Sequence, residues 1–252
     1  MVSPKELERE LNRLLVPENF RDYAPNGMQI ASDQLISRLV TGVSATQALI
    51  EAAITQKAQA ILVHHGYFWK GENPCLVGMK YRRIKQLMEH DISLFAYHLP
   101  IDAHPTLGNN AQLAGRLGIH IVDGLDKGNP YSIGNIGEFS EELTGQQLSQ
   151  RIADVLGRVP LHIDAPQKPI RTVAWCTGGA QGYIEQAIAC GVDAYITGEA
   201  SEQTTHIARE NGIHFFAAGH HATERYGVAA VGAMIAEKYD IKHEFIDIDN
   251  PV

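Results

Sequence analysis

The chain has 252 residues, of which 44% are hydrophobic and 20% charged, as in a folded globular protein with enough apolar material for one large domain or two smaller ones. Its 29 acidic and 21 basic residues give a formal net charge of −8, and no Lys/Arg cluster exceeds two adjacent residues, which excludes an extended nucleic-acid-binding surface. No apolar run approaches the roughly 20 residues of a membrane span, so we expect a cytoplasmic protein with no membrane partner.

The first predicted element is a helix that ends near residue 15. Ser3 as N-cap, Pro4 at the first helical position and Glu6 as reciprocal partner form a capping box. Strands and helices then alternate, which is typical of an α/β fold with a largely parallel sheet. The expected strands are 39–43, 60–63, 92–97 and 119–123, and the expected helices are 46–56, 81–89 and 109–117.

The second half of the sequence resembles the first. Residues 39–65 align without a gap on residues 173–199, with six of 27 positions identical, where about two are expected by chance. Each half ends in a helix and a strand, and the two terminal strands are expected at residues 119–123 and 243–248. We therefore predict two related α/β lobes with layered α/β/α sheets, at residues 1–125 and, including a connecting segment at 126–169, 126–252. The alternative is that any two βαβ units share such a pattern.

Histidines stand where predicted strands end. His64 and His65 directly follow the apolar run 60–63, and His98 and His220 follow two later runs of the same kind. Ligands of α/β proteins bind at the carboxyl ends of the strands. Related lobes that face each other would therefore place these side chains at a shared metal site between the lobes.

The pattern favours two metal ions over one. Adjacent residues of an extended strand point to opposite sides, so His64 and His65 are expected to bind different ions. Two ions about 3.5–4 Å apart need a bridging carboxylate. Glu224 suits this role because it stands four residues after His220, on the same face of a predicted helix. With Asp102 as second carboxylate, the set fits two divalent ions among Zn, Fe, Mn, Ni, Co and Mg, with positions open for water or substrate.

Other residues carry weaker signals. The segment 177–182 could cradle a phosphate with its backbone N–H groups, but a tight turn between strand and helix is the simpler interpretation. Glu199 and His206 are candidates for a general acid or base, or else solvated loop residues. The other histidines are interpreted as surface or core residues (His90, His120, His162, His243) or left open as groups that support the ligands (His104, His206, His214, His221).

Several motifs together resemble the signatures of the NIF-three-like family: ILVHHGYFWKG, HLPIDAHPTLGNN, ITGEASEQTTH and AAGHHATER. The resemblance extends from residue 22 to the end of the chain. It implies two α/β lobes, a dinuclear metal centre between them and a toroidal homohexamer. It also implies the ligands: His65, Asp102 and Glu224 for one ion, and His64, His220 and Glu224 for the other.

The same resemblance implies a reaction. Bacterial members of the family are known as homologues of type 2 GTP cyclohydrolase I, so we expect a metal-dependent hydrolase of a purine nucleotide. The named candidate is opening of the guanine ring of GTP with release of formate, since divalent ions can activate water for attack on C8. Two alternatives stay open: phosphoester cleavage of unusual or damaged nucleotides, and a non-catalytic, metal-binding hexameric scaffold.

Overall fold

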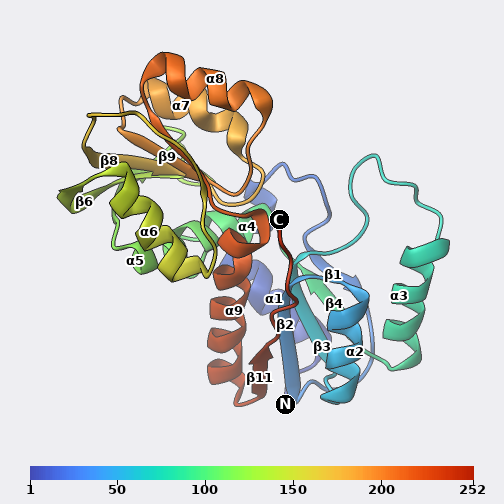
Figure 1. Ribbon diagram of the computed structural model, residues 1–252. Coiled ribbons are helices and arrows are strands. Elements are labelled where there is room, and N and C mark those ends of the chain that lie inside the picture. Colours follow the sequence, from blue (N-terminus) through green and yellow to red (C-terminus); the bar gives the residue numbers. More distant parts are fainter. The chain divides into compact units, whose positions relative to one another are not determined.

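The computed structural model describes all 252 residues and divides them into two compact units, each built on one β-sheet (Figure 1). Unit 1 comprises Met1–Ile101 and Gly227–Asp249, and unit 2 comprises Asp102–Tyr226 and Asn250–Val252. No helix combines the length and the apolar character that crossing a membrane requires.

The sheet of unit 1 has five strands. They are β1 (Gly27–Ile30), β2 (Arg38–Ser44), β3 (Ala60–His65), β4 (Ser93–Ala96) and β11 (Lys242–Phe245). In the sheet order β1-β4-β3-β2-β11, the four strands from β4 to β11 run parallel and β1 runs antiparallel to β4. The carboxyl ends of β2, β3 and β4 therefore meet at one edge of the sheet.

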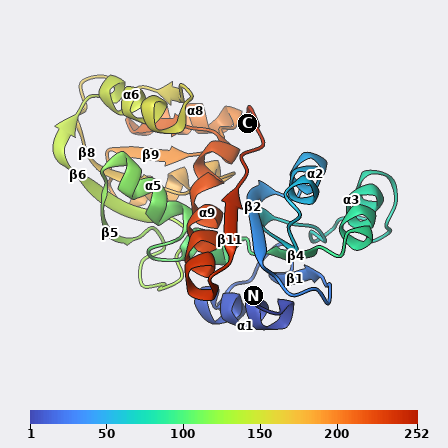
Figure 2. The same ribbon diagram turned by 90° about the horizontal axis from the view of Figure 1, so that it is seen from below.

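Helices cover both faces of this sheet (Figures 1 and 2). They are α1 (Pro4–Leu15), α2 (Gln47–Thr55), α3 (Gly78–Glu89) and, from Gly227 onward, α9 (His220–Tyr239), with a 3-10 turn η1 at Pro17–Asn19. The helices α2 and α3 pack on one face, where Val40, Ile61 and Leu94 point into a shared core. The helix α1 begins at Pro4 as predicted, and the Ser3 hydroxyl accepts the Glu6 N–H. The reciprocal bond from the Ser3 N–H to the Glu6 side chain, which would complete the predicted capping box, is not formed.

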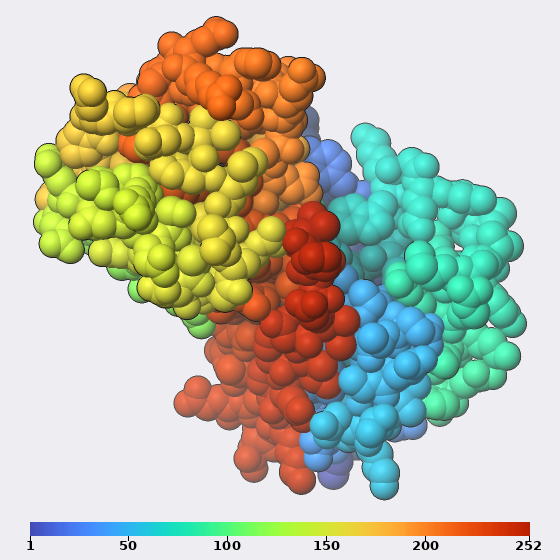
Figure 3. All heavy atoms as spheres, in the orientation of Figure 1, coloured from blue at the N-terminus to red at the C-terminus, as the bar shows by residue number.

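A long connection separates β3 from α3. Residues 66–77 contain neither a helix nor a strand, and they follow the predicted histidine pair directly. This loop and α3 form the teal surface in Figure 3. They expose the large apolar side chains Phe68, Leu76, Val77, Met79, Tyr81 and Met88. Long loops of this kind commonly carry function, so its position beside the histidines bears on the site.

The sheet of unit 2 has six strands. They are β5 (His120–Gly124), β6 (Asn135–Leu143), β7 (Leu161–Ile163), β8 (Ile170–Trp175), β9 (Ala194–Thr197) and β10 (His214–Ala217). In the order β5-β6-β8-β9-β10-β7, the strands β8, β9 and β10 run parallel. The flanking strands pair antiparallel, so only the centre of the sheet has the βαβ pattern.

Helices also lie on both faces of the second sheet. They are α5 (Asn109–Leu117), α6 (Gly145–Leu156), α7 (Ile184–Ala189) and α8 (Glu202–Asn211), with a 3-10 turn η2 at Gln181–Tyr183. The short helix α4 (Leu99–Ala103) contains the division between the units, which falls between Ile101 and Asp102. Figure 1 shows α5 and α6 on one face and α7 and α8 on the other. Along β8, Val173 and Trp175 face the first pair, whereas Ala174 faces the second. The predicted α/β/α layering is thus confirmed.

Both sheets share a core of the same topology. In unit 1 the chain runs β2-α2-β3-α3-β4, and in unit 2 it runs β8-α7-β9-α8-β10. An antiparallel strand, β1 or β7, lies beside the last parallel strand in each case. This repetition agrees with the internal duplication that the sequence predicts.

The predicted boundary between residues 125 and 126 differs from this division. The strand β5, predicted to end the first lobe, pairs with β6 in unit 2, and β11, predicted to end the second lobe, pairs with β2 in unit 1. Apolar periodicity identifies a strand but not the sheet that it joins. The predicted connecting segment 126–169 supplies β6, α6 and β7 to unit 2.

Candidate metal centre

Three imidazole rings lie together at the carboxyl ends of β3 and β4 in unit 1. The ring centroid of His64 is 4.5 Å from that of His65 and 4.9 Å from that of His98. One ligand nitrogen from each ring lies within 4.8 Å of the other two. All three histidines were predicted to lie at the ends of strands. His98, however, was not among the predicted metal ligands.

The argument that His64 and His65 point apart is wrong. Pairing of β3 with β4 ends at Val63, whereas pairing with β2 continues to His65. The strand is thus held on one side only at the histidines, and their rings lie side by side at an interplanar angle of 47°. The two rings are close enough to serve one ion as well as two neighbouring ions.

The rings of the pair are oriented through their Nδ1 atoms. The Nδ1–H of His64 donates to the carbonyl oxygen of Tyr97 at 3.2 Å, which places the lone pair of the neutral ring on Nε2. His65 Nδ1 lies 3.0 Å from Ser44 Oγ. Histidines that bind a metal through Nε2 are commonly fixed in this way.

Asp22 holds His98 and the turn that follows it. Its carboxylate accepts hydrogen bonds from His98 Nδ1 at 2.7 Å, from the Leu99 N–H at 2.9 Å and from the Asn26 amide at 2.9 Å. Burial would raise the pKa of Asp22, but these bonds and the charge of His98 outweigh it and bring the pKa to about 2. Asp22 was not among the predicted site residues. The only signal for it in the sequence is its position at the start of the loop motif DYAPNG.

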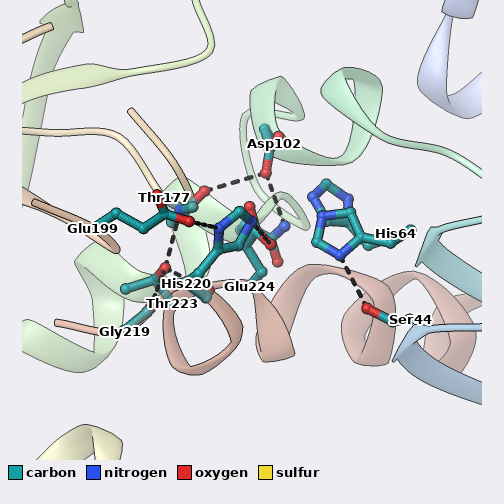
Figure 4. Close-up of polar contacts among 12 residues, drawn as sticks. Ser44, His64, Asp102, Thr177, Glu199, Gly219, His220, Thr223 and Glu224 are labelled. Atoms are coloured by element: carbon teal, nitrogen blue, oxygen red, sulfur yellow. Dashed lines mark hydrogen bonds and ion pairs between the residues drawn. The ribbon is translucent and has the colours of Figure 1, made fainter. Parts of the chain in front are cut away.

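In unit 2, the first turn of α9 pairs a histidine with a carboxylate. His220 Nε2 lies 3.2 Å from Glu224 Oε2, and His220 Nδ1 lies 2.6 Å from Glu199 Oε1 (Figure 4). Two atoms bound at about 2.0–2.2 Å to one ion are separated by roughly 3–3.5 Å. The prediction that helical spacing brings His220 and Glu224 together is confirmed.

This pairing creates a strong preference for positive charge. Glu224 is only 2% exposed, and Glu199 lies on the opposite side of the His220 ring. Burial lowers the pKa of His220, but the carboxylates of Glu224 and Glu199 outweigh it and raise the pKa to about 9. The negative charge of these two carboxylates stabilises the protonated His220 ring. The same charge would favour a metal cation bound to His220 in place of the proton.

The other predicted carboxylate, Asp102, is buried in α4. Its Oδ1 accepts hydrogen bonds from Asn109 Nδ2 at 2.8 Å and from Thr177 Oγ1 at 3.2 Å (Figure 4). Thr177 begins the turn after β8, so this turn fixes the carboxylate of Asp102 from outside its own helix.

The same turn packs against Glu224. Gly178 has a φ of +70°, its N–H donates to Thr223 Oγ1 at 3.0 Å, and a Cβ at this position would overlap Glu224 Oε1. The close approach requires glycine. Its N–H is used internally, which favours the tight turn over a phosphate cradle for residues 177–182.

Gly178→Ala is expected to displace Glu224, lowering metal affinity and stability together. The left-handed backbone alone costs alanine about 1–2 kcal/mol, and the overlap with the carboxylate adds to this. Unfolding in urea and metal content after gel filtration measure both effects. Gly182→Ala is the control, because Gly182 lies nearby with open space around it. Equal losses in both variants would contradict the role assigned to Gly178.

Of the two candidates for a general acid or base, Glu199 and His206, only Glu199 lies at the site. His206 is exposed on α8 and makes no hydrogen bond or ion pair, so its role as an acid or base stays a prediction. Glu199 instead contacts His220 directly. Elsewhere, His104 Nδ1 accepts the Leu107 N–H, His243 bonds Thr41, the His221 N–H donates to Val252, and His162 lies beside His214.

Comparison with known proteins adds a context to this geometry. Residues 2–251 match the family described as Duf34/NIF3 (NGG1p interacting factor 3). Relatives from Pseudomonas aeruginosa and Vibrio cholerae, both named "GTP cyclohydrolase 1 type 2 homolog", are 57% and 56% identical, over 97% and 98% of this chain and of their own lengths.

Solved structures show the same fold. The protein ybgI, described as of unknown function, is 48% identical with a TM-score of 0.95, and the match covers both chains completely. TTHA1606 from Thermus thermophilus is 29% identical with a TM-score of 0.90, again with complete coverage of both chains.

Proposed function

Because the chain belongs to the Duf34/NIF3 family, we propose that it is a metal-dependent hydrolase with two divalent ions per chain. The pairing of His220 with Glu224 is the observation that carries this proposal. We assign one ion to His65, Asp102 and Glu224, and the other to His64, His220 and Glu224. Glu224 would then bridge both ions.

The donor groups fit such ions. Imidazole nitrogens and carboxylate oxygens suit Zn, Fe, Mn, Ni, Co and, through the oxygens, Mg. In its neutral form the His64 ring, held through Nδ1, directs its lone pair to Nε2, and Glu224 is a buried carboxylate beside His220. Two carboxylates against two divalent ions leave net positive charge, which favours an anionic substrate or a water-derived ligand.

The residues around the ligands have separable tasks in the proposed reaction. Bound divalent ions would activate water and polarise the substrate. Glu199 would keep His220 oriented, and its carboxylate, 36% exposed, could exchange protons with solvent. In unit 1, Trp69 lies 5.9 Å from the His65 ring and 5.1 Å from the His98 ring, and offers a flat surface on which a purine could stack.

The name shared by the bacterial relatives suggests the reaction. One water would add at C8 of GTP and open the five-membered ring, and a second would release the formyl group as formate. The toroidal homohexamer and the cytoplasmic location stay part of this proposal.

Metal-reconstituted protein is expected to release formate from GTP, and Glu224→Gln is not. Formate is measured by NMR, and phosphate and nucleoside products by chromatography of the same reactions. Formate at the level of the Glu224→Gln control would contradict the GTP reaction. Phosphate release in its place would indicate phosphoester cleavage, and metal binding without turnover of any nucleotide would indicate a scaffold.

A further inference from the structure

A second group of metal-type ligands lies within unit 2, apart from the residues assigned above. His162 on β7 and His214 on the adjacent β10 bring their rings together, and Asp164 follows directly after β7. His162 Nε2 lies 3.2 Å from His214 Nδ1 and 3.7 Å from Asp164 Oδ1, and the latter two atoms are 3.3 Å apart. Sequence reasoning did not find this group, because the two histidines lie 52 positions apart and only the pairing of β7 with β10 brings them together.

These three distances, 3.2, 3.3 and 3.7 Å, lie within about 0.1 Å of the ligand separations along one face of a metal-ligand tetrahedron. Bonds of about 2.0–2.2 Å from a zinc ion to nitrogen or oxygen place neighbouring tetrahedral ligands roughly 3.3–3.6 Å apart. Octahedral ligands at the same bond length would lie about 2.8–3.1 Å apart, closer than any pair here. The cluster therefore suits an ion with tetrahedral coordination.

The His214 ring is oriented as a ligand would be. His214 is buried, and its Nε2–H donates to the carbonyl oxygen of Lys168 at 2.9 Å. This bond leaves the lone pair on Nδ1, which faces the cluster, and a backbone carbonyl is a usual support for a metal-binding histidine. The Ala165 N–H reaches Nδ1 at 3.3 Å, a long hydrogen bond that an ion could replace.

The His162 ring is kept neutral and in place. Burial is the main reason that the pKa of His162 lies below its usual value, so the ring is neutral near neutral pH and has a lone pair to offer. The ring stacks on Phe216 with centroids 4.3 Å apart. A Cβ at Gly145 would lie 2.5 Å from His162 Cε1 and 2.9 Å from His214 Cε1, so the glycine leaves the space that both rings occupy.

We propose that His162, Asp164 and His214 bind one Zn²⁺ ion independently of the dinuclear centre. Asp164 is 56% exposed, so water can supply the fourth ligand from solvent. The strand β7 lies at the edge of the sheet and pairs with β10 alone. The ion would therefore fasten β7 and the turn after it to β10.

Cobalt is a suitable probe, because tetrahedral Co²⁺ absorbs far more strongly in the visible than octahedral Co²⁺. Chelator-treated protein is expected to bind one Co²⁺ with tetrahedral absorption that Zn²⁺ displaces. Asp164→Asn and His162→Asn should weaken this binding by more than about 100-fold, since even supporting residues contribute 10–100-fold. Asp154→Asn, at another exposed aspartate of unit 2, and Glu224→Gln should both retain it.

The double variant Glu224→Gln/Asp164→Asn separates this ion from the dinuclear centre. Absorption retained in Glu224→Gln and lost in the double variant supports the proposal whatever the enzyme's activity. Equal Co²⁺ affinity in wild type and Asp164→Asn would overturn it. Because Asp164 is exposed, its substitution leaves the core intact, which circular dichroism verifies.

Discussion

Replacing Glu224 with glutamine is expected to empty the proposed dinuclear centre and reduce hydrolysis to background. The substitution keeps the shape of a side chain that is 2% exposed, but it removes the charge that both ions would share. Loss of a bridging ligand should weaken binding by more than about 100-fold, beyond the 10–100-fold effect of supporting residues. Metal analysis after gel filtration and the formate assay measure the two losses.

The Glu224→Gln variant can also be tested in metal-free protein, through the pKa of His220. The pKa of His220, about 9 in the wild type, should fall because one of the two carboxylates that stabilise the imidazolium is gone. An NMR pH titration detects this fall. Glu202→Gln, at an exposed glutamate of α8, is the matched control and should leave the His220 pKa unchanged. Full metal content in Glu224→Gln would contradict the bridging assignment.

Asp22→Asn is expected to cost about 2 kcal/mol of stability near neutral pH, given about 1.4 kcal/mol for each unit of pKa shift. The folded state lowers the pKa of Asp22 from 3.8 to about 2, through its bonds to His98 and its neighbours. This contribution is present above pH 3.8 and is lost as pH falls through about 2. The loss from Asp22→Asn should therefore shrink in acid.

Urea unfolding at a series of pH values tests this dependence. The difference in unfolding free energy between wild type and Asp22→Asn should be full above about pH 4 and small near pH 2. Asp33→Asn, at an exposed aspartate of the same unit, should resemble wild type throughout. A difference that stays constant with pH would show that Asp22 acts without its charge.

Local features of both fold and site could be predicted from the sequence. Apolar periodicity placed the central strands and helices, because it depends on residues a few positions apart. The spacing of His220 and Glu224 determined their contact for the same reason, since one helical turn joins them. Strand ends likewise located His64 and His65, although not the directions of their rings.

Features that depend on distant residues could not be predicted. Asp22 meets His98 across 76 positions, and no periodicity connects a loop carboxylate to a strand end so far away. His162 has no distinguishing neighbours in sequence, and only the pairing of β7 with β10 brings it to His214. The strands β5 and β11 were found, but their partners depend on the tertiary fold.

The crossed pairing of β5 and β11 makes the two halves of the chain mutually dependent. A fragment ending at residue 125 would lack β11 and expose the backbone edge of β2, while its own β5 would have no sheet to join. The other fragment, which begins at residue 126, would carry β11 without its partner strand β2. Unpaired edges of this kind invite aggregation. The two repeats are therefore not autonomous modules, and the chain could be divided between them only at the expense of both sheets.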